Sequence, residues 1–413
     1  MAPRGGKGTQ IVTRDAALIC AAGGTRAAAI SLVGVLIVIH LASRGLSVGA
    51  IGLIIGTGIA ASAAGTIIAA LRADRWGPRR TLVVLSLLSG AGYAALAFTA
   101  AVPVLMLIAA VAMLNGLGRD RGPASALEQA LLPATTTDER RTWTMAWYNV
   151  VVDSGHALGA LGAALPTVFA GALDMSAVDG RALTFVLCGI AVCASTIPYL
   201  LLRPHVAPVP APGFMTNDAV DPRTRAVVRR IAGLFAIDSI GGGFLSSALV
   251  AYWFFERYGT TEVQLAYLFF AARILNVVSH LAAAWMARRI GLVNTMVLTH
   301  LPSSVFMMLA PTAPTAGAAA ALFLAREALV EMDVPTRQSY VMAVVPPSAR
   351  TYASGMTNVT RNAGWAVGPL VGGTVMQHVS LAAPIVIGAT LKIFYDIALY
   401  RSFRHLKAPE EVT

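Results

Sequence analysis

The chain has 413 residues, of which 56% are hydrophobic and only 12% are charged, and its mean hydropathy is +0.69. A soluble domain typically carries about 25% charged residues, so this composition excludes an ordinary soluble protein and indicates a polytopic membrane protein. The formal net charge of +11 is typical of contact with an anionic membrane leaflet, and we expect no nucleic-acid binding.

Apolar segments long enough to cross a bilayer recur along the chain, since a membrane helix needs about 20 apolar residues. No cleavage site follows the basic residues 1–10, so the first segment is expected to be a retained span. The predicted spans are 15–41, 48–71, 81–101, 102–131, 142–168, 181–202, 229–255, 261–287, 292–311, 315–345, 350–375 and 380–400. The sequence therefore predicts an all-α membrane protein with twelve transmembrane helices.

The segment between the sixth and seventh predicted spans is polar and contains five prolines from Pro204 to Pro222. Such a composition is typical of a linker. We therefore predict an N-terminal six-helix bundle at 1–203, a cytoplasmic linker at 204–228 and a C-terminal six-helix bundle at 229–413, related by pseudo-symmetry.

The basic residues predict the orientation in the membrane. Twenty lysine and arginine residues fall at one end of the predicted spans, and only Arg44, Arg181 and Arg257 fall at the other. Basic residues concentrate on the cytoplasmic side of membrane proteins. We therefore expect an integral protein of the cytoplasmic (inner) membrane with both termini in the cytoplasm, and a monomer.

The two predicted bundles are related in sequence. A shift of 209 residues aligns 141–161 with 350–370 and makes eight positions identical, among them an Arg-Thr and an Asn-Val pair. Repeated halves with the binding site between them are typical of secondary transporters. Chance similarity between glycine- and alanine-rich helices is the alternative.

At this point the chain resembles the major facilitator superfamily of secondary transporters over nearly its whole length. The family's signature between helices two and three, Gly-x-Leu-Ala-Asp-Arg-x-Gly-Arg-Arg, corresponds to residues 70–79, where Asp74, Arg75, Gly77 and Arg79 match. Ala70, Arg72 and Pro78 depart from the pattern. The resemblance implies that this loop is a gate; a loop that only helps to set the topology is the alternative.

Glycines four residues apart occur in both counterpart helices, as Gly155 and Gly159 and as Gly364 and Gly368, the latter followed by Pro369. Small residues at this spacing allow membrane helices to approach closely, so we predict helix packing. The second set also resembles the family's antiporter motif. That motif belongs on helix five, however, where Ala160 replaces the proline.

The segment 115–123, Asn-Gly-Leu-Gly-Arg-Asp-Arg-Gly-Pro, places three charges in the predicted span 102–131. A charge in the hydrocarbon core costs about 2.5 to 3.5 kcal/mol, so it needs a partner, a cavity or a function. In the family, helices one, four, seven and ten line the central cavity. We predict that the cavity and a switchable ion-pair network are formed by Arg26, Arg119, Asp120, Arg121, Arg326, Glu327, Glu331, Asp333 and Arg361. Fixed structural pairs are the alternative.

Two carboxylates are candidates for proton coupling. Asp238 has no basic residue within four positions on its predicted helix and precedes three glycines. Burial without a counter-charge favours the protonated carboxyl, as a proton carrier requires. Asp153 with His156, at i,i+3, is the second candidate, since histidine titrates in the physiological range. A simple hydrogen-bonded pair is the alternative there.

The histidines show no metal-ligand spacing, and Cys20, Cys188 and Cys193 all lie in apolar segments. We therefore expect no metal site, no disulfide framework and no cofactor; buried thiols are the simplest interpretation, with contact to a soft metal or metalloid as the alternative.

Taken together, these features predict a secondary transporter, not an enzyme, that moves a small organic molecule across the bilayer by alternating access. We expect the proton gradient as its driving force and favour efflux. Two alternatives stay open: an importer or facilitator of an organic anion with Arg26, Arg119, Arg121 and Arg361 as ligands, and a receptor or assembly partner on the same fold.

Overall fold

The computed structural model describes residues 13–137, 140–203, 221–346 and 349–403, and all secondary structure in these ranges is helical. Each predicted span overlaps one helix or two or three consecutive helices. Eight segments of the described chain are long and apolar enough to cross a membrane. The predicted all-α membrane fold is thereby confirmed.

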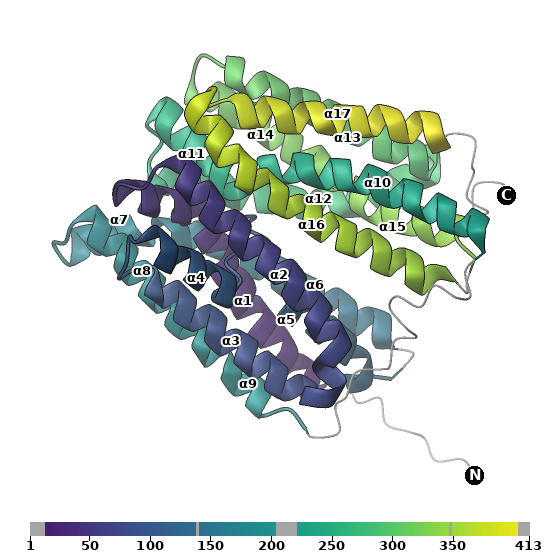
Figure 1. Ribbon diagram of the computed structural model, residues 1–413, viewed down its shortest axis with the longest axis horizontal. Helices are drawn as coiled ribbons and strands as arrows, with labels where there is room; N and C mark the ends of the chain where they lie inside the picture. The colour runs from purple at the N-terminus through teal and green to yellow at the C-terminus, as the bar shows by residue number, and fades with distance from the viewer. Residues whose placement is uncertain (1–12, 138–139, 204–220, 347–348, 404–413) are drawn as a thin grey trace, which may run out of the picture.

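Two helical bundles lie side by side (Figure 1). The first contains α1 (Arg14–Ser43), α2 (Val48–Trp76), α3 (Pro78–Ala95), α4 (Val102–Ala112), α5 (Pro123–Leu131), α6 (Arg141–Leu161), α7 (Leu165–Ala172), α8 (Ala177–Ala194) and α9 (Thr196–Leu200). Short 3₁₀ turns, η1 (Leu132–Thr135) and η3 (Gly162–Ala164), follow α5 and α6.

The second bundle contains α10 (Pro222–Phe244), α11 (Ser247–Tyr258), α12 (Glu262–Ile290), α13 (Leu292–Leu309), η4 (Ala310–Thr312), α14 (Ala316–Val330), α15 (Asp333–Val344), α16 (Arg350–His378) and α17 (Ala383–Phe403). Residues 204–220 of the predicted linker lie outside the described ranges. Residues 222–228 of the predicted linker belong to α10. The helix starts there because Asp221 caps its amino end by accepting hydrogen bonds from the backbone of Arg223 and Thr224.

The predicted span 102–131 is not one continuous helix, which corrects the sequence-based prediction. α4 ends at Ala112; Met113, which follows it, has a positive φ of 54°, and Gly118 has a φ of 70°. α5 starts at Pro123, which has no N–H to donate and cannot continue a preceding helix. Arg119, Asp120 and Arg121 therefore lie on an unwound segment, 113–122, and not on a helix.

Two further interruptions face this unwound segment in the second bundle. Ser246 separates α10 from α11 just after the three glycines and caps α11, and Glu331 separates α14 from α15. Three hydrogen bonds from the second bundle end on carbonyl oxygens of the unwound segment. They run from Ala248 N to Gly116 (3.1 Å), from Ser247 Oγ to Leu117 (2.9 Å) and from Arg273 Nη2 to Gly118 (3.0 Å).

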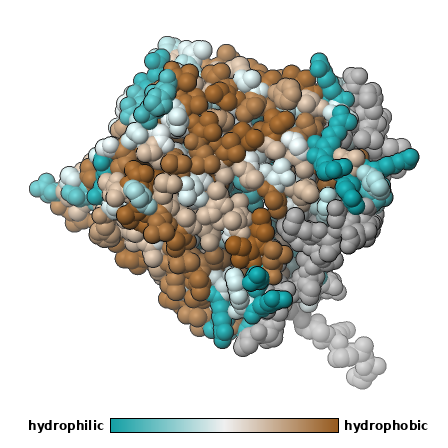
Figure 2. Space-filling model, viewed as in Figure 1, coloured by the Kyte–Doolittle hydropathy of each residue, from teal (hydrophilic) through white to brown (hydrophobic). Residues whose placement is uncertain are grey.

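The outer surface is apolar where the bundles would face lipid. Large hydrophobic side chains such as Leu107, Leu281 and Phe394 are exposed on it. Figure 2 shows hydrophobic residues over most of the visible face, with hydrophilic side chains toward its margins. An integral membrane protein needs such a surface, since the hydrocarbon of the bilayer replaces water there.

The bundles touch most closely through α2 and α16 (Figure 1). A Cβ added to Gly52 would lie 2.5 Å from the carbonyl oxygen of Pro369, and the backbone N–H of Gly49 donates to Gln377 Oε1 at 3.1 Å. At the same end, Arg181 of α8 pairs with Glu262 of α12 at 2.7 Å. This end of the bundle is therefore closed, and it lies away from the end at which α1 begins and α17 ends.

Candidate functional site

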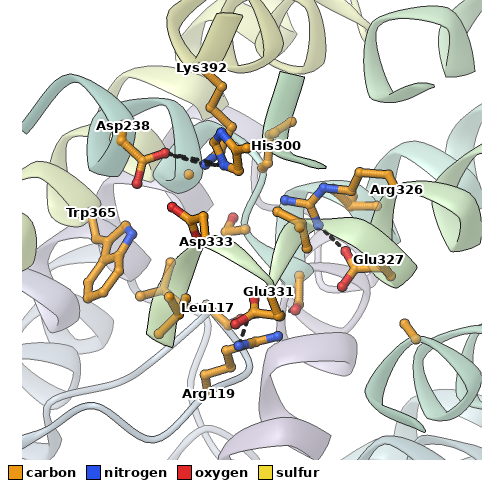
Figure 3. Close-up of a pocket in the computed structure, with 18 of the residues that line it drawn as sticks. Leu117, Arg119, Asp238, His300, Arg326, Glu327, Glu331, Asp333, Trp365 and Lys392 are labelled. Atoms are coloured by element: carbon orange, nitrogen blue, oxygen red, sulfur yellow. Dashed lines mark hydrogen bonds and ion pairs between the residues drawn. The ribbon is translucent and has the colours of Figure 1, made fainter. Parts of the chain in front are cut away.

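A cavity of about 120 Å³ lies between the two bundles, at the level of the interrupted helices. The first bundle contributes Leu117, Arg119 and Arg121 from the unwound segment, and the second bundle contributes the rest of the lining (Figure 3). Phe269, Phe323 and Trp365 form apolar parts of the wall. The site is therefore assembled from both halves of the chain.

The cavity wall is rich in charge and is not balanced. Among the residues that the structure describes, seven arginine or lysine side chains and four carboxylates line it, an excess of three positive charges. The cations are Arg119, Arg121, Arg273, Arg326, Arg337, Arg361 and Lys392, and the carboxylates are Asp238, Glu327, Glu331 and Asp333.

Arg119 connects the two bundles at the cavity. Its guanidinium lies 2.8 Å from Glu331 Oε1 and also donates to Asn276 Oδ1. Arg119 and Glu331 both occupy helix interruptions, one in each bundle. The ion-pair partner of Arg119 is therefore Glu331 of the second bundle.

Glu327 and Arg326 form a second group beside this pair. Asn276 donates to Glu327 Oε2 at 2.7 Å, and the guanidinium of Arg326 contacts Glu327 Oε1 (Figure 3). Asp333 and Arg337, four residues apart on α15, form an ion pair as well, with 3.1 Å between Arg337 Nη1 and Asp333 Oδ2.

Asp238 is surrounded by cations, contrary to the argument that made it a candidate proton carrier. Lys392 Nζ lies 2.6 Å from its Oδ1 and Arg337 Nη1 lies 3.0 Å from its Oδ2. The nearest of these partners is 99 residues away in the sequence. The lack of a basic residue nearby on its own helix therefore did not mean the lack of a counter-charge, and Asp238 is an ion-paired carboxylate.

His300 and Asp396 extend the same cluster away from the cavity. Nδ1 of His300 lies 2.8 Å from Asp396 Oδ1, and Nε2 lies 3.3 Å from Lys392 Nζ. Asp396 is fully buried. We call this cluster the C-half network; it consists of Asp238, His300, Asp333, Arg337, Lys392 and Asp396.

Arg26 and Asp120 lie in the core of the first bundle and not on the cavity wall. Arg26 Nε contacts Asp120 Oδ2 at 2.7 Å and its Nη2 contacts Glu128 Oε2 at 2.5 Å. The hydroxyls of Tyr148 and Tyr199 also donate to Glu128. This cluster, the N-half network, fixes the unwound segment to α1 through Asp120.

Asp153 and His156 form a long contact at the edge of ion-pair distance. His156 Nδ1 lies 3.7 Å from Asp153 Oδ1, and 45% of the Asp153 side chain is exposed. His156 Nε2 accepts a 2.9 Å hydrogen bond from the backbone N–H of Asp120. The histidine therefore supports the unwound segment.

Arg121 and Arg361 approach the same tryptophan. Their guanidinium carbons lie 4.3 and 4.7 Å from the Trp365 ring centroid, one arginine from each bundle. Cations over a tryptophan ring are attracted by its quadrupole. Within the described ranges neither arginine has a carboxylate within ion-pair distance.

The predicted gating loop connects α2 to α3. Gly77 has a φ of 83° and precedes the first turn of α3. Arg79 donates to the carbonyl oxygens of Leu200 and Leu202, which joins α3 to the end of α9. Arg75 is exposed, and the side chain of Asp74 lies outside the described part of the structure.

The paired glycines lie at helix crossings in both bundles. A Cβ added to Gly155 or Gly159 would lie 2.4 or 2.0 Å from backbone oxygens of α1. On α16, a Cβ on Gly364 would lie 2.9 Å from Ser239, and one on Gly368 would meet the backbone of α10 at 2.0 Å. Pro369 lies inside α16, and its carbonyl oxygen faces α2.

Cys20 and Cys188 are buried free thiols, and Cys193 is half-buried. Among the described residues no group of three or more histidine, cysteine or acidic side chains is arranged to hold a metal ion.

Several residues of the two networks were not among the predicted site residues. Glu128, Arg273, Lys392 and Asp396 are charged residues inside the predicted spans, and His300 shows no metal-ligand spacing. Their rarity in apolar helices was the available signal. Tyr148, Tyr199 and Asn276 carry no such signal, because tyrosine and asparagine are uncharged.

Comparison with known proteins agrees with this architecture. Residues 19–369 match the family model of the Major Facilitator Superfamily. The chain is 25% identical over 421 residues to an uncharacterized membrane protein of Saccharomyces cerevisiae, covering 94% of this chain and 93% of that one.

Solved structures share the fold at low sequence identity. A bacterial homolog of the human lysosomal transporter Spinster, in an inward-facing and unoccupied conformation, superposes with a TM-score of 0.71 at 14% identity, covering 98% of both chains. The nucleoside transporter NupG superposes with a TM-score of 0.70 at 13% identity, covering 95% of this chain and 98% of that one. With two bundles, a cavity between them and a family match over most of its length, this chain belongs to the Major Facilitator Superfamily.

Proposed function

We propose that the protein is a secondary transporter that moves a small organic anion through the membrane by alternating access, coupled to protons. The observation that carries the proposal is the excess of cations on the cavity wall, where seven cations face four carboxylates. An uncompensated buried charge is costly, so this wall favours a negatively charged solute. An organic anion, which the sequence left as an alternative, is therefore the first candidate for the substrate.

The interiors of the predicted spans contain eight basic and eight acidic residues, and this balance conceals the excess. Arg26 pairs with Asp120 and Glu128 within the first bundle, Asp396 faces His300 behind the cavity wall, and Asp153 is not part of the lining. The remaining seven cations and four carboxylates line the cavity.

Arg121, Arg273 and Arg361 are the first candidates to hold the anion. Arg273 donates to a backbone carbonyl and to Ser247, and the other two face Trp365. A planar guanidinium binds a carboxylate through two parallel hydrogen bonds. Arg121 and Arg361 come from opposite bundles, so an anion between them would favour closure of the cavity around it.

The closed end of the bundle supports alternating access. If the termini are cytoplasmic, as the basic residues predict, the contacts between α2 and α16 close the outer side. Opening that side requires these contacts and the Arg119–Glu331 pair to separate. The pair is thus a candidate switch that breaks and re-forms during each cycle.

A thermal-shift screen of the purified protein tests the charge of the solute. The probes are benzoate, succinate, glucose and choline, which are anionic, anionic, neutral and cationic. A ligand at about 100 times its Kd stabilises a protein by about 2.7 kcal/mol, so we expect a raised Tm with at least one carboxylate and none with choline. Stabilisation by choline or glucose alone would refute the proposal that the substrate is an anion.

Two arginine variants and a matched control test the site itself. Arg121→Gln and Arg361→Gln should each weaken binding of the stabilising carboxylate tenfold or more, equivalent to about 1.4 kcal/mol. Arg257→Gln, which removes an exposed arginine outside the cavity, should bind as the wild type does. Equal affinities in all three variants would place the anion elsewhere.

Flux into proteoliposomes then distinguishes the remaining mechanisms. A receptor would bind the carboxylate and move neither it nor protons, and a facilitator would move the carboxylate without protons. A gradient with the acid inside the proteoliposomes drives export by a symporter and import by an antiporter, so the same assay distinguishes these two forms of coupling. On sequence grounds we favour efflux, and the sequence leaves the choice between symport and antiport open.

A further inference from the structure

Both ring nitrogens of His300 face charged groups. Nδ1 lies 2.8 Å from Asp396 Oδ1, while Nε2 lies 3.3 Å from Lys392 Nζ and 3.7 Å from Asp238 Oδ1. Figure 3 shows His300 beside Lys392 and opposite Asp238. Because a carboxylate faces Nδ1, that nitrogen holds a proton in either charge state. Nε2 is therefore the atom that gains or loses one.

The groups around His300 come from three helices. On α17 they are Lys392, Asp396 and Tyr395, whose ring stands edge-on to the imidazole at 5.9 Å. α10 contributes Asp238. α15 contributes Asp333 and Arg337, which reach the cluster through the Arg337–Asp238 pair.

The charges of the C-half network balance only when His300 is protonated. Three carboxylates, Asp238, Asp333 and Asp396, face two permanent cations, Arg337 and Lys392. Neutral His300 leaves one negative charge in excess, and protonated His300 leaves none. A buried excess charge is costly, so the network is built to take up one proton.

The position of the network suits a carrier. Asp238, His300 and Lys392 line the cavity, while Asp396 is fully buried behind them. All six residues belong to the second bundle. Rocking of the bundles therefore exposes His300 to one side and then the other without breaking the network, unlike the Arg119–Glu331 pair, which spans both bundles.

We infer that His300, oriented by Asp396, is the proton-binding site of this transporter, an inference that rests on the proposed function. A proton from cavity water binds Nε2; the hydrogen bond from Lys392 to that atom is lost, and the new N–H faces Asp238. The same atom releases the proton when the cavity opens to the other side. A protonated His300 adds positive charge to the wall, so proton and anion bind together as in symport.

A test without any solute examines the proton site directly. Wild-type protein labelled with ¹⁵N-histidine gives ring signals for its seven histidines, and the signal absent from His300→Gln belongs to His300. We expect this signal to shift between about pH 5 and 8, the range in which histidine titrates. An unchanged His300 signal over that range would overturn the inference. The spectrum of His40→Gln, which should lack a different signal, checks the assignment.

A flux assay tests coupling, using whichever of benzoate and succinate stabilises the protein more. For each of His300→Gln and Asp396→Asn, accumulation driven by a pH gradient is compared with the variant's own rate of carboxylate exchange without a gradient. We expect this ratio to fall at least tenfold below the wild-type ratio. His40→Gln is the matched control, since His40 is also fully buried but bonds only to the carbonyl of Leu96 within the described ranges. Accumulation at the wild-type level in His300→Gln would refute the role of His300 in coupling transport to protons.

The two proposals fail in different ways. If the wild type moves neither carboxylate, the proposed function fails, while the histidine titration still decides whether His300 takes up a proton. If the wild type accumulates carboxylate and the His300 variant does too, only the proton site is wrong.

Discussion

Single residues at the cavity gain their role from partners far away in the chain. Arg119 and Glu331 are separated by more than two hundred positions, yet their side chains meet at 2.8 Å with only 20% and 11% of their surfaces exposed. Such a pair contributes little net stability, while either partner alone is a costly charge. A pair of this kind suits a contact that must open and close.

A double-mutant cycle tests whether Arg119 and Glu331 interact as the geometry indicates. Arg119→Ala and Glu331→Ala should each destabilise the protein, and the double variant should lose less than the sum of the two. The expected interaction free energy is about 0.5 to 3 kcal/mol, as for residues in direct contact. Thermal melting in detergent measures it, and simple additivity would mean that the pair is not formed in solution.

Helix crossings are controlled by glycines at matching places in the two bundles. Gly155 and Gly159 bring α6 against α1, as Gly364 and Gly368 bring α16 against α10. Close backbone approach of this kind allows many van der Waals contacts, which hold membrane helices together in the absence of a hydrophobic driving force. The repeat in the sequence therefore corresponds to a repeated crossing in space.

Gly159→Ala should loosen the first of these crossings. Its new Cβ would lie 2.0 Å from the Ala28 carbonyl oxygen, so α1 and α6 must shift, at a cost of about 1 to 3 kcal/mol in stability. Gly171→Ala is the matched control, because no atom lies within 4 Å of its added Cβ, and alanine is better than glycine in a helix by roughly 0.5 to 1 kcal/mol. Equal Tm values for the two variants would contradict a packing role.

At the scale of the whole molecule, the two bundles meet at one end and separate around a cavity. The closing contacts involve Gly49, Gly52 and Gln377, together with the Arg181–Glu262 ion pair between α8 and α12. Alternating access requires this end to open once in each cycle. A bond that holds it shut should therefore stop transport without unfolding either bundle.

The variant Gly49→Cys, Thr374→Cys tests this requirement. A Cβ added to Gly49 would lie 3.7 Å from the Cα of Thr374, so a disulfide between these positions is expected under oxidising conditions. Carboxylate exchange in proteoliposomes should cease on oxidation and return with dithiothreitol, while each single cysteine variant stays active under both conditions. Unimpaired exchange in the cross-linked protein would show that this end does not open.

The sequence by itself determined the class of the protein, the position of its spans and its family, because apolar runs and loop motifs are local properties of the chain. It also located the repeat that relates α6 to α16. It did not reveal the interruption between α4 and α5, because residues 102–131 are apolar on average and the local conformations of Met113 and Gly118 do not alter hydropathy.

Only the tertiary structure decided which charges pair. Arg26 and Glu128 are 102 positions apart in the sequence, and Lys392 and Asp238 are 154 positions apart. No short segment of the sequence therefore contains both partners of either pair. Sequence reasoning took Asp238 as unpaired and His300 as unremarkable for that reason. Coulomb interactions depend on distance in space, and membrane helices bring distant segments together once their backbone hydrogen bonds are satisfied internally. Folding thus converted a neutral set of intramembrane charges into a positive cavity with a histidine at its wall.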